Sequence, residues 1–288
     1  MRWAEIQVET TAQAQDAVGN IMFENGCGGI AIQGEAPVLV TCYLPVDDRL
    51  EERLLRMENG IKAVPRFGLD IGSGEITIKY AEEQDWAEAW RQYFHTIRVG
   101  KRVVVKPTWE RYERKAGDVV VEIDPGMAFG TGNHPTTQLC LRALEKYVRP
   151  RRVAVDFGTG SGILAIAAAK LGASLVIAFD CDDTAVRAAR ANVQQNNLEE
   201  RIEVHKSDGL GFINCRVDLV TANLVAETIM GQSQALADLL KTGGVLIASG
   251  ITAGRSMEVE QSLRNAGFDI AEILTQDEWV TIVARKAR

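Results

Sequence analysis

The sequence predicts an α/β protein of two domains, and three observations support this expectation. Residues 1–80 read as short strands and helices in the order βαββαβ. From residue 150 onward, apolar strands alternate with helices, which is the pattern of a parallel sheet covered by helices on both faces. A helix rich in aromatic residues separates the two parts. We therefore expect domains at 1–81 and 98–288, joined by a linker helix at 82–97.

The elements of the first domain follow from the spacing of its apolar residues, which alternate in strands and recur every three or four positions in helices. The resulting order is that of a small ferredoxin-like α+β domain. Asp47 is expected to cap the second helix. Strands are expected at 3–9, 30–32, 38–44 and 75–80, and helices around the apolar stripes 14–22 and 50–61.

Aromatic residues at positions i, i+4, i+7 and i+8 from Trp86 mark an amphipathic helix at 82–96. Such a stripe usually serves packing, and its place between two domains suggests a connecting helix. The apolar segments 103–105 and 119–123 then predict a pair of strands.

The second domain alternates strands with helices and closes with a hairpin, so we expect a Rossmann-like sheet. In such sheets ligands bind beyond the carboxyl ends of the parallel strands, and the loops at those ends are the candidates for a functional site. Strands are expected at 153–155, 175–179, 202–205, 217–221 and 245–249, helices at 138–147, 161–171, 182–197, 227–240 and 255–266, and the hairpin at 268–274 and 280–284.

The turn after the strand 153–155 carries the strongest functional signal, because it contains Gly158, Gly160 and Gly162. Glycines adopt backbone angles closed to other residues and let the backbone lie against a ligand. The helix that follows points unpaired N–H groups and a partial positive charge at that ligand. The dinucleotide fingerprint places its third glycine where this chain has Ile163, which weakens a nicotinamide or flavin interpretation.

Two carboxylates flank the glycine turn: Asp156 ends the strand before it and Asp180 ends the strand after it. This D-x-G-x-G-x-G pattern resembles motif one of the S-adenosylmethionine-dependent methyltransferases. The resemblance implies that the turn holds the methionine moiety of the cofactor and that Asp180 takes both ribose hydroxyls. We expect Asp156, the three glycines and Asp180 all to belong to the cofactor site. The alternative is an ordinary turn between a strand and a helix.

Three more loops lie at the expected strand ends. The segment 123–137 holds three glycines and two prolines, which indicates a shaped loop, and Thr136 and Thr137 open the helix behind it. Their hydroxyls either cap that helix or meet a ligand. In the loop after the third strand, Asp208 is placed where a carboxylate could meet an adenine amino group.

Asn223 ends the strand after Asp218 and is followed by Leu224. In the functional interpretation, the Asn223 side-chain oxygen and the Leu224 carbonyl accept hydrogen bonds from an amine and aim its lone pair at a methyl group. The alternative is an amide satisfied by the backbone.

The segments DPGMAFGTGNHPTTQLCL, VDFGTGSGILAIAAAKLGA and DLVTANLVAE together resemble the PrmA family, whose members methylate the large-subunit ribosomal protein L-eleven (L11). The resemblance covers residues 83–285 well, and the first domain agrees in element order more than in sequence. It implies a class I methyltransferase sheet, an N-terminal domain that recognises the ribosomal protein, and a linker helix that lets this domain swing.

The same resemblance implies roles for individual residues. It carries cofactor contact to Thr137, Gly158, Asp180 and Asn223, and it places Phe129 and Trp279 near the reacting amine. The implied reaction is an in-line displacement at the sulfonium methyl by a lysine or terminal amine taken up neutral. Phe129 and Trp279 could face the methylammonium product, although core packing is the alternative for Trp279.

Composition limits the other possibilities. The chain has a net charge of −7, which disfavours a broad nucleic-acid-binding face, and residues 1–80 hold twelve acidic against seven basic side chains, which suits a basic partner. Five scattered cysteines indicate reduced thiols and neither a disulfide framework nor a metal site. No apolar run reaches the ~18 residues that a membrane helix needs. We expect a cytoplasmic monomer that binds neither membranes nor nucleic acid directly.

Three alternatives stay open from the sequence. The chain could methylate another protein or a small amine, or it could bind the cofactor without activity. A nucleic-acid amino methyltransferase fits less well, because Asn223 is followed by Leu-Val-Ala and not by the Pro-Pro-aromatic sequence of such enzymes.

Overall fold

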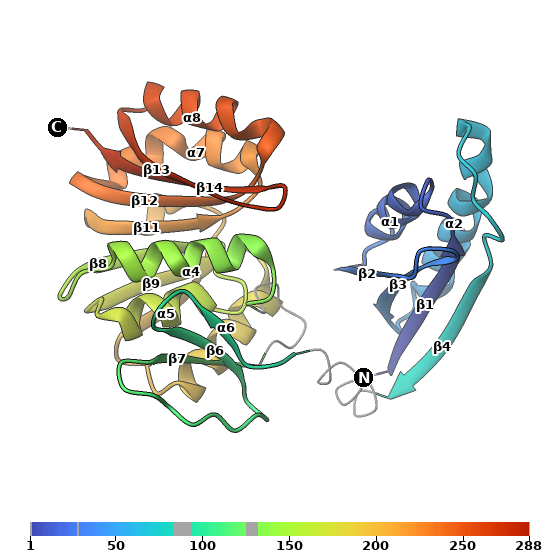
Figure 1. Ribbon diagram of the computed structural model, residues 1–288, viewed down its shortest axis with the longest axis horizontal. Coiled ribbons are helices and arrows are strands. Elements are labelled where there is room, and N and C mark those ends of the chain that lie inside the picture. Colours follow the sequence, from blue (N-terminus) through green and yellow to red (C-terminus); the bar gives the residue numbers. More distant parts are fainter. Residues whose placement is uncertain (1, 28, 83–93, 125–131, 288) are drawn as a thin grey trace. The chain divides into compact units, whose positions relative to one another are not determined.

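The computed structural model describes residues 2–27, 29–82, 94–124 and 132–287. The chain divides into two compact units, Met1–Tyr93 and Phe94–Arg288, which are described separately (Figure 1). Most of the expected linker helix lies outside the described residues. At its ends the expectation was wrong, because Glu82 belongs to a strand, residues 94–96 are not helical and Ile97 begins another strand.

In its described residues, the first unit is a four-stranded antiparallel sheet in the order β2-β3-β1-β4, with two helices packed on one face. The βαββαβ order confirms the ferredoxin-like prediction. Asp47 is not the helix cap: α2 begins at Leu50, and Asp47 accepts the Arg49 N–H in the preceding turn (3.0 Å). The elements are β1 Arg2–Thr10, α1 Gln15–Glu24, β2 Ile30–Gln33, β3 Val38–Pro45, α2 Leu50–Ala63, a 3₁₀ turn Val64–Phe67 and β4 Ile76–Glu82.

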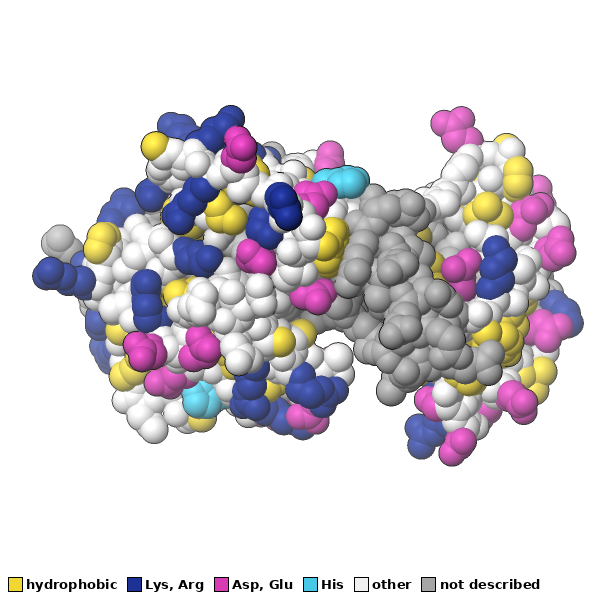
Figure 2. All heavy atoms as spheres, turned by 90° about the horizontal axis from the view of Figure 1, so that it is seen from below, with side chains coloured by type: hydrophobic (Ala, Val, Ile, Leu, Met, Phe, Trp, Pro, Cys, Tyr) yellow, Lys and Arg dark blue, Asp and Glu magenta, His cyan; other side chains and the backbone are white. Residues whose placement is uncertain are grey.

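Apolar side chains of β1, β3, α1 and α2 form the core of this unit, including the fully buried Ile6, Met22 and Leu44. The surface of the unit carries acidic side chains next to exposed hydrophobic ones (Figure 2).

The second unit contains a seven-stranded sheet in the order β10-β9-β8-β11-β12-β14-β13. Strands β10 to β12 are parallel, and β14 runs antiparallel to both of its neighbours. From β8 the chain first builds β9 and β10 on one side and then crosses to β11 on the other. Ligands bind at such a reversal of strand order, so the edge between β8 and β11 is where a site is expected.

The elements of the second unit agree closely with the sequence prediction. They are β5 Ile97–Val99, β6 Val103–Pro107, β7 Val119–Ile123, α4 Pro135–Tyr147, β8 Val153–Phe157, α5 Ile163–Leu171, β9 Leu175–Asp180, α6 Asp183–Gln195, β10 Ile202–Lys206, β11 Val217–Asn223, α7 Ala226–Leu239, β12 Leu240–Thr252, α8 Ser256–Asn265, β13 Phe268–Gln276 and β14 Trp279–Lys286, with 3₁₀ turns at Leu210–Phe212 and Ala253–Arg255.

Helices cover both faces of the large sheet, as predicted. Helices α4, α5 and α6 lie on one face and α7 and α8 on the other (Figure 1). A small sheet, β5-β6-β7, packs against the first group of helices and so forms a further layer. Its β6–β7 pair was expected and is parallel, whereas β5, only three residues long, was not expected.

One boundary matters for the site. Helix α4 begins at Pro135, three residues before the predicted start, because proline is preorganised for the first helical position and His134 serves as the N-cap. Of the two alternatives for the threonine hydroxyls, the helix cap is therefore excluded. Thr136 and Thr137 lie inside the first turn, and both are buried.

Candidate active site

The glycine turn between β8 and α5 is pinned against the end of β9. Gly158, Gly160 and Gly162 have φ values of 70°, 53° and 84°, which favour glycine. The N–H groups of Gly158 and Thr159 both donate to the Phe179 carbonyl at 3.0 Å. The turn therefore has one fixed shape, set by its contacts with β9.

Asp156 holds this turn in place through side-chain hydrogen bonds. It is 1% exposed, and its Oδ2 accepts hydrogen bonds from the Thr159 hydroxyl (2.7 Å) and the Ala165 N–H (3.2 Å), while Oδ1 accepts from the Thr221 hydroxyl (2.6 Å). Burial raises the pKa of this carboxyl, and the three donors partly oppose that shift. One N–H of the first turn of α5 is thus taken by Asp156, so it is not available to a ligand as the sequence suggested.

Asp180 stands at the carboxyl end of β9, beside the glycine turn. Its Oδ2 accepts the Gly160 N–H and its Oδ1 accepts the Asp182 N–H, both at 3.0 Å. The side chain is only half-buried. Since a carboxylate oxygen accepts two hydrogen bonds, both oxygens keep capacity for a ligand hydroxyl.

Asp208 lies at the same edge of the sheet, after β10. The neighbouring Ser207 donates its N–H to the Asp180 carbonyl at 3.0 Å, and the Asp208 side chain is exposed. Contact between Asp208 and an adenine stays a prediction.

Asn223 and Leu224 sit at the tip of β11, next to the glycine turn. Ala222 pairs with Phe157, so Asn223 follows directly beside Gly158. Leu224 donates its N–H to the Ser249 carbonyl on β12 at 3.0 Å. The backbone of this tip is therefore held between β8 and β12.

The N-cap and the first turn of α4 contribute three polar side chains to this site. The Asn223 Nδ2 donates to the Thr136 Oγ at 3.2 Å, and that hydroxyl lies 2.7 Å from Nδ1 of His134. Thr137 is fully buried, and its Oγ has no hydrogen-bond partner among the described residues. A buried hydroxyl without a partner is costly, which marks Thr137 as a group that a ligand would satisfy.

Trp279, the first residue of β14, is half-buried and meets His134 edge-on. The ring centroids are 5.0 Å apart, at an interplanar angle of 65°. Trp279 is therefore connected to the site by its contact with the His134 imidazole. Phe129 lies outside the described residues, and its role stays a prediction.

Two residues were missed by the sequence reasoning. His134 was given no role, although the proline after it is a signal of a helix start. Asn192 of α6 is 2% exposed; its Nδ2 donates to the Ser161 carbonyl (2.9 Å) and its Oδ1 accepts the Asp124 N–H (2.8 Å). It thus ties the glycine turn to Asp124. A polar residue on the buried stripe of a helix is the signal that could have revealed Asn192.

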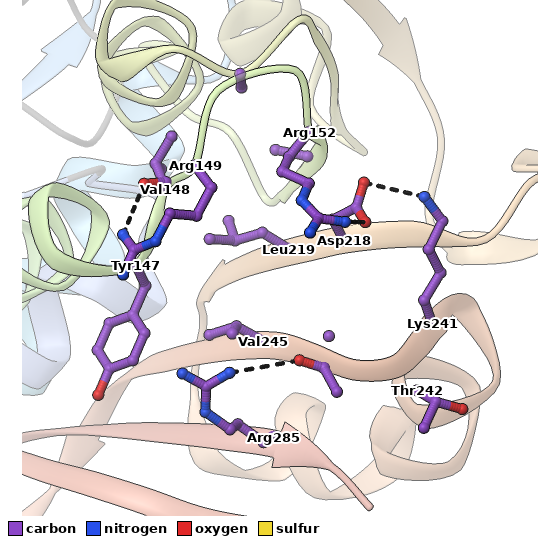
Figure 3. A pocket seen from close by; sticks show the side chains of 14 residues that line it. Tyr147, Val148, Arg149, Arg152, Asp218, Leu219, Lys241, Thr242, Val245 and Arg285 are labelled. Carbon is purple, nitrogen blue, oxygen red and sulfur yellow. Dashed lines mark hydrogen bonds and ion pairs between the residues drawn. The ribbon is translucent and has the colours of Figure 1, made fainter. Parts of the chain in front are cut away.

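A cavity of about 190 Å³ lies at the edge of the large sheet opposite the glycine turn (Figure 3). Its cations already have partners: Arg152 and Lys241 bind the Asp218 carboxylate at 2.8 and 3.0 Å, Arg149 donates to carbonyls at the end of α4, and Arg285 donates to a carbonyl within β12. Cations at helix ends stabilise the exposed carbonyls there. This cavity is explained by the packing of the fold.

The family follows from comparison with known proteins. A family model of the ribosomal protein L11 methyltransferases (PrmA) matches residues 2–287. The chain belongs to the PrmA family. Ribosomal protein L11 methyltransferases of Bacillus cereus (strain G9842) and Bacillus cytotoxicus are each 40% identical to it over 312 aligned positions, which cover both chains completely. A crystal structure of ribosomal protein L11 methylase from Lactobacillus delbrueckii subsp. bulgaricus is 34% identical, with a TM-score of 0.63 over 68% of this chain and 100% of that one.

Membership of the PrmA family confirms the resemblance drawn from the three motifs and makes the chain an S-adenosylmethionine-dependent methyltransferase of EC class 2.1.1. The residues present fit that cofactor. The turn Gly158–Gly162 offers a close backbone approach, and Asp180 offers acceptors for hydroxyls. The Thr137 hydroxyl, which has no partner in the part of the chain that the structure describes, offers a polar contact. Along the described stretches of the chain, no helix is long and apolar enough to cross a membrane.

Proposed function

We propose that this chain transfers methyl groups from S-adenosylmethionine to lysine side-chain amines, and to the terminal amine, of ribosomal protein L11. The observation that carries the proposal is the placement of Asn223. It stands at the strand-order reversal beside Gly158, and its amide N–H is engaged by Thr136, which leaves its Oδ1 as an acceptor for an incoming amine.

The cofactor contacts follow from the same arrangement. The glycine turn, held from below by Asp156, and Thr137 would bind the methionine moiety, Asp180 the ribose hydroxyls and Asp208 the adenine. When bound, the cofactor supplies an electrophilic methyl group on a sulfonium. The chain's own contribution is to fix both reactants in line, which in model reactions is worth up to ~7–11 kcal/mol.

The amine must arrive without its proton, because only the neutral form has a lone pair. A free lysine has a pKa of ~10.4, and a site of low polarity favours the neutral form. The Asn223 Oδ1 and the Leu224 carbonyl would accept the amine N–H groups and aim the lone pair at the methyl carbon. These two acceptors would hold the nitrogen in line with the methyl group, and the extra proton that the nitrogen carries after the transfer would leave to water. Phe129 and Trp279 would pack against the methylated product.

Recognition of the protein substrate is proposed for the first unit. Helix α2 covers β4 incompletely, so Ile78 and Tyr80, which point to the helix side of the sheet, are 38% and 54% exposed. Leu55 of α2 is 58% exposed and lines a cavity of about 510 Å³ with Ile78 and with Glu51. An apolar groove with acidic residues on an acidic domain suits an apolar segment of a basic protein.

The remaining proposals concern the setting of the enzyme. All five cysteines, including the buried Cys27 and Cys42, are free thiols, which supports a reducing cytoplasm. The net charge of −7 supports the absence of direct nucleic-acid binding. A monomeric state stays a prediction.

The deciding experiment incubates the purified chain with methyl-labelled cofactor and purified L11, followed by mass mapping of the product. We expect label on lysine or terminal amines of L11, and none with Asn223→Ala, although calorimetry should still detect cofactor binding by that variant. Equal labelling of free amines would favour the small-amine alternative. Full activity of Asn223→Ala would refute the assigned role of Asn223.

A further inference from the structure

His134, Thr136 and Asn223 form a continuous chain of hydrogen bonds that ends at the proposed amine acceptor. The His134 Nδ1 lies 2.7 Å from the Thr136 Oγ, and the same Oγ lies 3.2 Å from the Asn223 Nδ2. Thr136 is 1% exposed, so water has little access to the middle of the chain. A buried chain of this kind restricts the hydrogen positions of its members.

The directions of these hydrogen bonds follow from the cap of α4. The His134 Nδ1 accepts the Thr136 N–H at 3.4 Å, so this nitrogen carries a lone pair and the imidazole proton is on Nε2. The Thr136 hydroxyl then donates its single hydrogen to Nδ1. Its oxygen is left as an acceptor, and the only half of the Asn223 amide that can donate to it is the NH₂ group. The amide is thereby oriented with its Oδ1 away from Thr136.

The surroundings of His134 keep the imidazole neutral and in place. Burial lowers the pKa of His134 below its ordinary value, while the charge of Glu278, in the turn between β13 and β14, acts in the opposite direction. The Trp279 indole packs edge-on against the ring at a centroid distance of 5.0 Å and restricts its rotation. The β13–β14 hairpin thus holds the end of the chain that lies farthest from Asn223.

We propose that His134 is a positioning residue, which acts through the Thr136 hydroxyl to fix the Asn223 amide with its oxygen toward the methyl-accepting amine. This inference rests on the proposed function for the identity of the amine. It adds His134, to which no role was assigned, and extends the role of Thr136. It also gives Trp279 a task other than contact with the substrate, because the indole orients the imidazole.

Protonation of His134 would reverse the direction of the hydrogen bonds from His134 through Thr136 to Asn223. A proton on Nδ1 would donate to the Thr136 oxygen and remove the acceptor of the helix cap. The Thr136 hydrogen would then be free to donate to the Asn223 oxygen, which favours the flipped amide and presents NH₂ to the amine. The methyl-accepting geometry is therefore coupled to the charge of one imidazole, and it is lost as the pH falls through the lowered pKa of His134.

The first test compares Thr136→Val with Thr136→Ser in the full chain. Valine keeps the shape of the side chain and removes the hydroxyl, whereas serine keeps the hydroxyl. We expect Thr136→Val to lower kcat by about 10- to 100-fold, the scale of lost orientation and of one hydrogen bond. The cofactor Kd should stay within about twofold, and Thr136→Ser should restore most of the rate. A kcat of Thr136→Val equal to that of the wild type would overturn the inference.

The second test follows rate against pH. A lysine nucleophile alone gives log kcat a slope of one below its pKa of ~10.4. The wild type should fall more steeply once the pH drops through the pKa of His134, which burial lowers below the ordinary imidazole value of ~6.5. His134→Asn retains a side chain that caps helices well but cannot titrate, so its profile should keep a slope of one. An extra acid limb that persists in His134→Asn would contradict the inference.

A third measurement needs no substrate, so it separates this inference from the proposed function. Nitrogen NMR of the full chain should show His134 protonated on Nε2 at pH 8, and the Asn223 side-chain NH₂ signals should shift with the midpoint of His134. In Thr136→Val that linked shift should vanish. A proton on Nδ1 at pH 8, or Asn223 signals that do not shift with the titration of His134, would refute the proposed hydrogen-bond chain even if L11 is methylated. If the Asn223 signals shift with His134 but L11 is not methylated, the proposed substrate would be refuted and the hydrogen-bond chain would be established.

Discussion

Gly158 and Leu224 are packed so closely that a Cβ on Gly158 would come within 2.4 Å of the Leu224 Cδ2. The glycine turn and the tip of β11 therefore meet in direct contact, with the Leu224 side chain lying over the backbone of the turn. Gly158 also has a φ of 70°, which disfavours any other residue. The proposed cofactor turn and the proposed amine acceptor are thus parts of one packed unit.

Gly158→Ala should damage both functions of that unit. The left-handed backbone costs an alanine roughly 1–2 kcal/mol, and the clash displaces Leu224 in addition. We expect a lower Tm, weaker binding of S-adenosylhomocysteine by calorimetry and a loss of methyl transfer. Gly117→Ala is the matched control, because Gly117 has a φ of 86° and nothing within 4 Å of its Cβ position. Equal effects of the two variants would show that the contact with Leu224 is unimportant.

Asp156 is expected to act as a support and not as a direct ligand, and two substitutions separate these roles. In Asp156→Asn the amide oxygen can still accept from Thr159 and Ala165, while the new NH₂ can donate to Thr221, whose hydroxyl can turn to the Val155 carbonyl at 3.3 Å. Cofactor affinity should then stay within about threefold. Asp156→Ala leaves buried donors unpaired at ~1–3 kcal/mol each and should lower both Tm and affinity. A large loss of affinity in Asp156→Asn would show that the carboxylate charge itself meets the cofactor.

The parts of this fold that the sequence revealed are those specified by local patterns. The glycine spacing after β8 and the alternation of apolar strands with helices lie within short segments, and they located the sheet, its reversal and the turn. The carboxylate Asp156 was found by the same pattern, but whether it faces a ligand or the core depends on Thr221, 65 residues away. Asn192 was missed for the same reason, since its partners Ser161 and Asp124 lie 31 and 68 residues away in the sequence. The partner of His134, Thr136, is only two residues away, but Thr136 meets Asn223 across 87 residues, so the link from His134 to the site is made by the fold.

The Thr137 hydroxyl should have opposite effects on the free and the bound protein. It is buried without a partner in the described part of the chain, so Thr137→Val should leave Tm unchanged or raise it. If the cofactor satisfies this hydroxyl, the same substitution should weaken cofactor binding by about 5- to 150-fold, equivalent to ~1–3 kcal/mol. Thr10, which is also buried without a partner there but lies in the first unit, provides the control. Thr10→Val should affect Tm similarly and leave cofactor affinity unchanged; an equal change of affinity in both variants would exclude a direct contact.

Asp118 should contribute to stability against acid. Its carboxylate accepts from the Tyr112 hydroxyl (2.7 Å), Arg98 (2.8 Å) and the Lys115 N–H (2.9 Å), and these donors, Tyr112 foremost, lower its pKa to about 2 from a model-compound value of 3.8. A carboxyl whose pKa is lower in the folded state stabilises above the unfolded pKa, and this stabilisation is lost as pH falls from ~4 toward 2. Urea unfolding at several pH values between 2 and 6 should show a weaker acid dependence for Asp118→Asn than for the wild type. Parallel curves for the two proteins would contradict this assignment.

The groove between α2 and β4 should determine the affinity for the protein substrate and leave the rate of methyl transfer unchanged. Leu55 is 58% exposed and lines the groove, so Leu55→Ser removes apolar surface at little cost to the fold. If L11 docks there, the KM for L11 should rise by about tenfold or more, the scale of a lost interface anchor, while kcat and cofactor affinity stay unchanged. Phe67→Ser is the control, because Phe67 is 80% exposed on the same unit and does not line the groove. An unchanged KM for Leu55→Ser, or an equal rise for both variants, would place the docking surface elsewhere; a fall in kcat would mean that the groove also positions the target amine.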